Sequence, residues 1–151
     1  MANPAPAAGQ PRRISLELLQ RLETVLAQVT APIVQQLGLS VVAADAQQVT
    51  LRMPVTPVVV HGGGVVCGQA LMAAADTAMI LAVAASLGEF RPMTTVQLQT
   101  SFLKPVPGTA TEVWVVCTLL RRGKSLAFGD IRLNTPDGTL AAHATTTYAL
   151  L

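Results

Sequence analysis

Apolar residues follow a helical period over one stretch of this chain and form continuous runs over others, and these patterns predict its helices and strands. Over residues 14–29 they recur every three or four positions, as on one face of a helix. Ser15 is a suitable N-cap for that helix, and Pro32 follows its end. We expect a second, short helical segment at residues 31–37, ended by Gly38.

Residues 68–87 are apolar at nearly every position and are followed by Gly88, so they predict a long helix without a polar face. Such a helix must be covered by other elements. The remaining apolar runs are separated by turns that contain Gly, Pro or Asp, which is typical of strands. The expected strands span residues 39–44, 48–53, 94–103, 109–120, 126–134 and 139–149.

Short turns between these segments make at least the last three strands antiparallel neighbours. We therefore expect an α+β fold in which an antiparallel sheet wraps around one long central helix, with an additional N-terminal helix. On this interpretation residues 14–151 form a single domain, and residues 1–13 form a disordered tail.

Composition limits the possible partners. The 151 residues are 51% hydrophobic and only 12% charged, which favours a self-associating protein. A formal charge of +2 is too small to indicate a nucleic-acid partner. Cys67 and Cys117 provide neither a disulfide framework nor metal-ligand spacing, so we expect a reduced, cytoplasmic setting and no metal or cofactor.

The long apolar helix also raises the possibility of a membrane span. Residues 70–87 approach the ~20 residues that a spanning helix needs. Asp76 would then lie near the bilayer centre, at a cost of roughly 2.5–3.5 kcal/mol. We therefore predict a buried core helix and no membrane partner.

Asp76 is the single charged residue between Arg52 and Glu89. Burying an ionised carboxylate without partners is costly, so Asp76 is either structurally paired or chemically active. Gly68 is expected to begin the helix, where backbone N–H groups lack acceptors. A helix N-terminus followed by a carboxylate two turns further along can serve as an oxyanion site beside a base.

Four short motifs occur in order along the chain: residues 75–79 (ADTAM), 95–105 (TVQLQTSFLKP), 122–127 (RGKSLA) and 142–148 (AHATTTY). Together they resemble the hotdog fold and, within it, the PaaI-like acyl-CoA thioesterases. The resemblance covers about residues 31–151. It implies hydrolysis of an acyl-CoA thioester by a homodimer or homotetramer, with each site shared across a subunit interface.

The active-site loop of that family reads N-x-x-G-x-x-H-G-G, with the acid nine residues after the His. Counted back from Asp76, the His position is Cys67 and the Asn position is His61. The two glycine positions are Gly68 and Gln69. The visible His61-Gly-Gly segment is therefore not the family's His-Gly-Gly, and the acid and the first glycine are what remains of the pattern.

The resemblance implies that Asp76 is a general base or nucleophile and that the Gly68 N–H polarises the thioester carbonyl. His61 either orients water or donates to the thioester, or is an exposed loop residue; both remain open. For Cys67 we favour a small packed residue over a reactive thiol, although a helix N-terminus lowers a thiol pKa. The remaining substrate-binding candidates near the site, beside Cys67, are Gln69 and Thr95.

Arg121, Arg122, Lys124 and Ser125 are expected on one turn between two strands. Positive side chains there suit the phosphates of coenzyme A, as the family's similar turn implies. The alternative is a solvated, charged hairpin turn.

Two other functions stay open. Because the family's Asn and His are replaced, the chain is alternatively a non-catalytic acyl-CoA-binding or sensing domain. A hotdog hydratase or dehydratase is less favoured, since the pairing of a catalytic His with an acid typical of those enzymes is missing. The sequence leaves the acyl group open.

Overall fold

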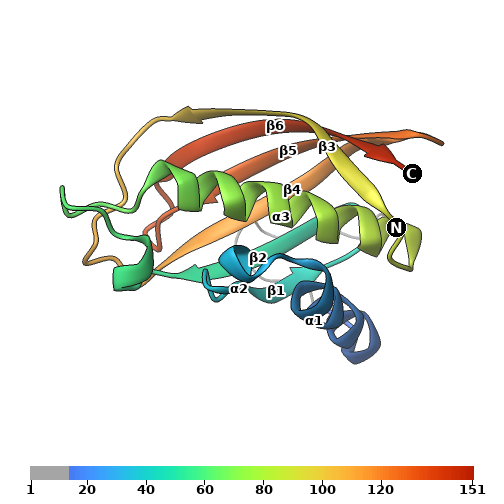
Figure 1. Cartoon of the computed structure of the whole chain (residues 1–151), viewed down its shortest axis with the longest axis horizontal. Helices are drawn as coiled ribbons and strands as arrows, with labels where there is room; N and C mark the ends of the chain where they lie inside the picture. Colours follow the sequence, from blue (N-terminus) through green and yellow to red (C-terminus); the bar gives the residue numbers. More distant parts are fainter. Residues whose placement is uncertain (1–13) are drawn as a thin grey trace, which may run out of the picture.

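A six-stranded antiparallel sheet wraps around one long helix in the computed structural model, which describes residues 14–151 (Figure 1). The expected disordered tail, residues 1–13, lies outside these residues. The strand order across the sheet is β1-β2-β4-β5-β6-β3. In chain order the elements are α1 (Leu16–Val29), α2 (Pro32–Gln35), β1 (Ser40–Ala44), β2 (Gln48–Pro54), η1 (Pro57–Val59), α3 (Gly68–Leu87), β3 (Met93–Phe102), β4 (Glu112–Arg122), β5 (Leu126–Asn134) and β6 (Leu140–Leu150).

The predicted α+β architecture, with its central helix and additional N-terminal helix, is confirmed. Helix α3 begins after Cys67, whose backbone is extended, and ends at Gly88, whose φ of 77° favours glycine. Of the helices within residues 14–151, α3 has the length and hydropathy to cross a membrane. However, 67% of its most apolar window is buried inside this chain, which fits a core helix.

Small side chains let the sheet approach α3 closely. At Gly129 on β5, a Cβ atom would lie 2.5 Å from the Met79 sulfur of α3. Cys117 on β4 completes this contact, with its Sγ 3.9 Å from the Met79 sulfur. Burial raises the pKa of the Cys117 thiol to about 12, so this cysteine is a packed residue of the core.

Side chains on β6 alternate between the two faces of the sheet. Thr146 and Tyr148 are buried against the helix side, whereas His143 lies on the other face. The His143 Nε2 atom is 3.0 Å from an oxygen of Asp130, its neighbour on β5. His143 is therefore part of the outer sheet surface.

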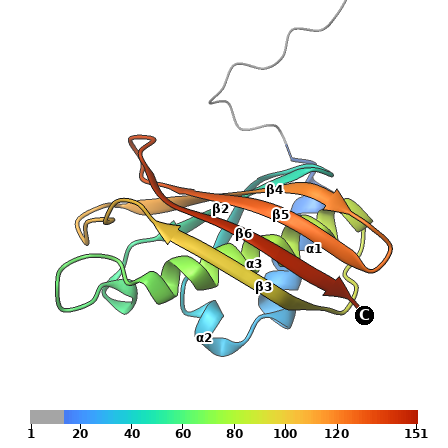
Figure 2. The same ribbon diagram turned by 90° about the horizontal axis from the view of Figure 1, so that it is seen from above.

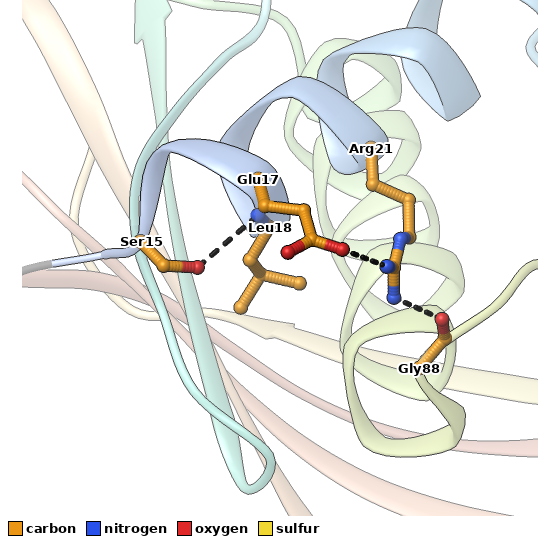
Figure 3. Close-up of polar contacts among 5 residues, drawn as sticks. All are labelled: Ser15, Glu17, Leu18, Arg21 and Gly88. Carbon is orange, nitrogen blue, oxygen red and sulfur yellow. Dashed lines mark hydrogen bonds and ion pairs between the residues drawn. The ribbon is translucent and has the colours of Figure 1, made fainter.

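Helix α1 covers the end of α3 (Figure 3). The Ser15 hydroxyl accepts a hydrogen bond from the Leu18 N–H at 3.2 Å, which confirms the expected N-cap. The Arg21 guanidinium donates to the backbone carbonyl of Gly88 and to Glu17, the latter at 3.0 Å. Arg21 thus ties α1 to the carbonyl that closes α3.

Strand β3 forms one edge of the sheet (Figure 2). It pairs with β6 alone, and most of its residues are exposed. Two apolar side chains of β3 and one just after it are more than half exposed: Val96 at 60%, Phe102 at 52% and Leu103 at 54%. A long edge with such side chains is suited to pairing with another chain.

Candidate active site

The Asp76 carboxylate lies where α3, β3 and β6 meet. Its Oδ1 atom accepts a hydrogen bond from the Thr95 hydroxyl at 2.9 Å and another from the Tyr148 hydroxyl at 2.6 Å. The Tyr148 hydroxyl also lies 2.9 Å from the backbone carbonyl oxygen of Asp76. The expected acid is thus half-buried and held by two hydroxyl donors.

Strand pairing determines this arrangement. Thr95 on β3 and Tyr148 on β6 are direct cross-strand partners, so their side chains point to the same face of the sheet. Tyr148 is only 1% exposed. Burial, followed by the hydrogen bond to Asp76, raises the pKa of the Tyr148 phenol, so that it stays a neutral donor.

Thr95 is among the site residues predicted from the sequence, whereas Tyr148 is not. One signal was present, since Tyr148 has the same strand parity as the buried Ala142, Ala144 and Thr146. It is also the only tyrosine in the chain, and a buried phenol needs a hydrogen-bond partner. That this partner is Asp76 depends on how β6 packs against α3, which the sequence alone does not show.

Gly68 begins α3, as expected, and Cys67 before it provides no side-chain cap. Within residues 14–151 the Gly68 N–H has no acceptor, which leaves it available to a ligand. A Cβ atom on Gly68 would lie 3.1 Å from the Phe102 ring. A groove of about 430 Å³ opens here, bounded by Val66, Gly68, Leu71 and residues 102–106, of which Lys104 is the one charged residue.

Asp76 and Gly68 lie on the same helix but not side by side. They are eight residues apart, which corresponds to roughly 12 Å along the axis at 1.5 Å per residue. One subunit therefore does not bring the carboxylate and the Gly68 N–H to the same carbonyl group. Of the two neighbours of Gly68, Cys67 is half-buried and packs against the core, whereas Gln69 is exposed.

His61 is exposed in the loop before α3. Its Nδ1 atom accepts a hydrogen bond from the Gly63 N–H at 2.8 Å, so the neutral ring carries its proton on Nε2. Gly64, with a φ of 79°, completes the turn and donates its N–H to the His61 carbonyl at 2.9 Å. The His61 ring is thus held within its own loop, and its Nε2–H is the group that can donate a hydrogen bond.

The basic residues lie at the other end of α3. Strand β4 extends through Arg121 and Arg122, so the turn itself is formed by residues 123–125. The Arg122 side chain donates to the Ser86 hydroxyl of α3 at 2.8 Å, while Arg121, Lys124 and Ser125 are exposed. The contact between Arg122 and Ser86 was not predicted from the sequence.

The register links this basic cluster to the carboxylate. Arg122, Ala127, Tyr148 and Thr95 form one row across β4, β5, β6 and β3. Arg122 is therefore two strands from Tyr148, or roughly 10 Å. The basic cluster belongs to the Asp76 region rather than to the Gly68 region of the same subunit. No group of three His, Cys, Asp or Glu side chains in the described part of the chain could hold a metal ion.

Comparison with known proteins identifies the family to which the chain is similar. Residues 59–142 match the model of the thioesterase superfamily. No curated protein sequence matches the chain significantly.

Solved structures share the fold at low sequence identity, which supports the fold alone. A Haemophilus influenzae thioesterase has a TM-score of 0.76 at 22% identity, covering 86% of this chain and 90% of that one. The Escherichia coli PaaI protein from the phenylacetic acid degradation operon has a TM-score of 0.76 at 17% identity, covering 89% and 94%. Zebrafish thioesterase superfamily member 2 has a TM-score of 0.78 at 19% identity, covering 92% and 100%.

Proposed function

The chain belongs to the thioesterase superfamily, and from this premise we propose that it hydrolyses acyl-CoA thioesters to a free acid and coenzyme A. The observation that carries the proposal is the Asp76 carboxylate, held by two hydroxyl groups on an otherwise apolar helix. In the reaction a water oxygen bonds to the carbonyl carbon, the C–S bond breaks, and the thiol of coenzyme A leaves. As general base, Asp76 takes a proton from that water and returns it to the departing sulfur. As nucleophile, its oxygen bonds to the carbonyl carbon instead, the thiol leaves, and water then hydrolyses the acyl-aspartyl anhydride.

The separation of Asp76 and Gly68 along α3 favours a site that is completed by a second copy. We place the interface at the exposed edge strand β3, paired antiparallel with the same strand of the second copy about a two-fold axis. Thr95, near the start of β3, contacts Asp76, and Phe102, at its end, lies against Gly68. Pairing centred between residues 98 and 99 therefore places Asp76 of one subunit near the partner's Gly68.

In such a shared site the N-terminus of α3 stabilises the charge that develops on the thioester oxygen. The Gly68 N–H finds no acceptor among residues 14–151, and the helix dipole favours negative charge there. The groove beside Gly68 has mostly apolar walls, as an acyl chain requires. His61, through its Nε2–H, is a second donor from the same loop.

The basic cluster is assigned to the coenzyme A phosphates. Arg121 and Lys124 are exposed, and Arg122 is oriented by its hydrogen bond to Ser86. Arg122 lies in the same cross-strand row as Tyr148 and roughly 10 Å from it, which leaves space for the pantetheine arm between thioester and phosphates. Ser125 adds a hydroxyl in the same turn.

The decisive variant is Asp76→Asn, assayed by thiol release from short, medium, long and aryl acyl-CoA esters. We expect turnover to fall at least ~100-fold, because the amide cannot accept the proton from water. Asp130→Asn is the matched control, since Asp130 is also a half-buried carboxylate but lies on the outer face of the sheet. It should retain wild-type turnover.

The same assay separates the alternatives. If the wild type binds acyl-CoA esters without hydrolysing any of them, the protein is a non-catalytic binding domain, and the His61 and Cys67 replacements are the obvious reason. If Asp76→Asn and Asp130→Asn are equally active, Asp76 is not the catalytic acid. If the wild type neither binds nor hydrolyses these esters, the proposed substrate class is wrong.

A further inference from the structure

Both hydrogen bonds to the Asp76 carboxylate end on the same oxygen. Thr95 and Tyr148 donate to Oδ1, and within residues 14–151 Oδ2 accepts no hydrogen bond. We propose that Tyr148 is a positioning residue that fixes the carboxylate so that Oδ2 is the atom facing water and substrate. This inference rests on the proposed catalytic role of Asp76.

The Tyr148 hydroxyl contacts two oxygens of Asp76. The phenol oxygen is 2.6 Å from the side-chain Oδ1 and 2.9 Å from the backbone oxygen of the same residue, Asp76. It thus contacts both the carboxylate and the turn of α3 from which the carboxylate extends. A donor placed between these two oxygens restricts rotation of the Asp76 side chain. The short distance to Oδ1 is typical of a hydrogen bond to a charged acceptor.

Burial separates the role of Tyr148 from that of Thr95. Tyr148 is 1% exposed on β6, which is paired on both sides, with β5 and β3. Thr95 lies on the exposed edge strand, beside a bulge between Thr95 and Gln97. The rigid donor is therefore Tyr148, and an apolar ring of the same size would fill its space without holding the acid.

The phenol acts through the carboxylate and does not itself exchange protons with the substrate. Its raised pKa, caused by burial and by the bond to Asp76, keeps it protonated throughout the neutral range. Removal of its hydroxyl should therefore affect the position of the Asp76 carboxylate while leaving substrate contacts in place.

Tyr148→Phe tests this inference, and Thr146→Val is its matched control. Thr146 is a second buried hydroxyl on the same face of β6, but it donates to the Gln97 carbonyl at 2.8 Å and not to the acid. We expect Tyr148→Phe to lower kcat about 10–100-fold with little change in KM, the effect of losing one hydrogen bond to a charged group.

A crystal structure of each variant provides a readout that does not depend on activity. The Asp76 side chain should leave its wild-type rotamer in Tyr148→Phe and keep it in Thr146→Val. Unchanged kinetics and an unchanged Asp76 rotamer in folded Tyr148→Phe would overturn the inference. If wild type hydrolyses no thioester, the proposed function fails, while the rotamer still decides whether Tyr148 positions Asp76.

Discussion

Gly68 combines two properties at the start of α3: a backbone N–H without an acceptor in the described part of the chain, and the absence of a side chain toward Phe102. The proposed mechanism uses only the first of these, because the N–H binds the thioester oxygen. The residue before it, Cys67, has φ −69° and ψ 146°, a conformation that also suits a residue preceding proline. Proline is well tolerated at the first position of a helix, where its missing N–H breaks no helical hydrogen bond.

Gly68→Pro is therefore expected to remove the carbonyl-binding donor while keeping the helix. We predict a loss of about 10²–10³-fold in kcat, the usual cost of one oxyanion donor. Gly68→Ala is the matched control, because its Cβ atom meets the same Phe102 ring while its N–H remains. Steady-state kinetics decide the question: equal losses in both variants would mean that crowding against Phe102, and not the N–H, is responsible.

At the level of secondary structure, the contact between α3 and the sheet depends on a glycine facing a methionine. Gly129 on β5 leaves space for the Met79 side chain, which is fully buried and also contacts Cys117. Because protein interiors are closely packed, an added methyl group there has no free volume to occupy. The closeness of β5 to the helix thus depends on this pair.

Gly129→Ala should destabilise the protein by about 1–3 kcal/mol, as overpacking of a core does. Combined with Met79→Ala, it should cost less than the sum of the two single changes, because the shortened side chain makes room for the methyl group. Urea denaturation of the four proteins measures this coupling. Gly62→Ala, where a Cβ atom would meet nothing within 4 Å, is the control and should be nearly neutral. Additive losses would show that the two residues do not share one space.

For the whole molecule, the central question is whether one active site draws on two subunits. Asp76 and Gly68 lie roughly 12 Å apart along α3, so a single subunit cannot direct both at one carbonyl. The exposed β3 edge, with Val96 and Phe102 more than half exposed, is the surface at which we place the second subunit.

Mixed dimers test this arrangement directly. One subunit carries Asp76→Asn and the other Gly68→Pro, each with a different tag so that only mixed dimers are purified. In a shared-site dimer, one of the two sites then has both residues intact, and about half of the wild-type activity should remain. Each homodimeric variant should be nearly inactive. If the mixed dimers are as inactive as the homodimers, each site lies within one subunit.

Much of the fold and part of the site could be predicted from the amino-acid sequence, because the relevant signals are local. A helical period identified α1, a continuous apolar stretch ended by Gly88 identified α3, and apolar runs between turn residues identified the strands. Asp76 was recognisable as the single acid on an apolar helix, and Gly68 as the residue at its start. These features depend on neighbours within a few positions along the chain.

The tertiary structure decided which of these groups meet. The pairing of Thr95 with Tyr148 places both hydroxyls on one oxygen of Asp76, and the row from Thr95 to Arg122 sets the distance to the basic cluster. Register is a non-local property, since a shift of one residue turns every side chain of a strand to the opposite face. The sequence by itself therefore determined the elements and the acid, and only strand pairing determined what holds the acid in place.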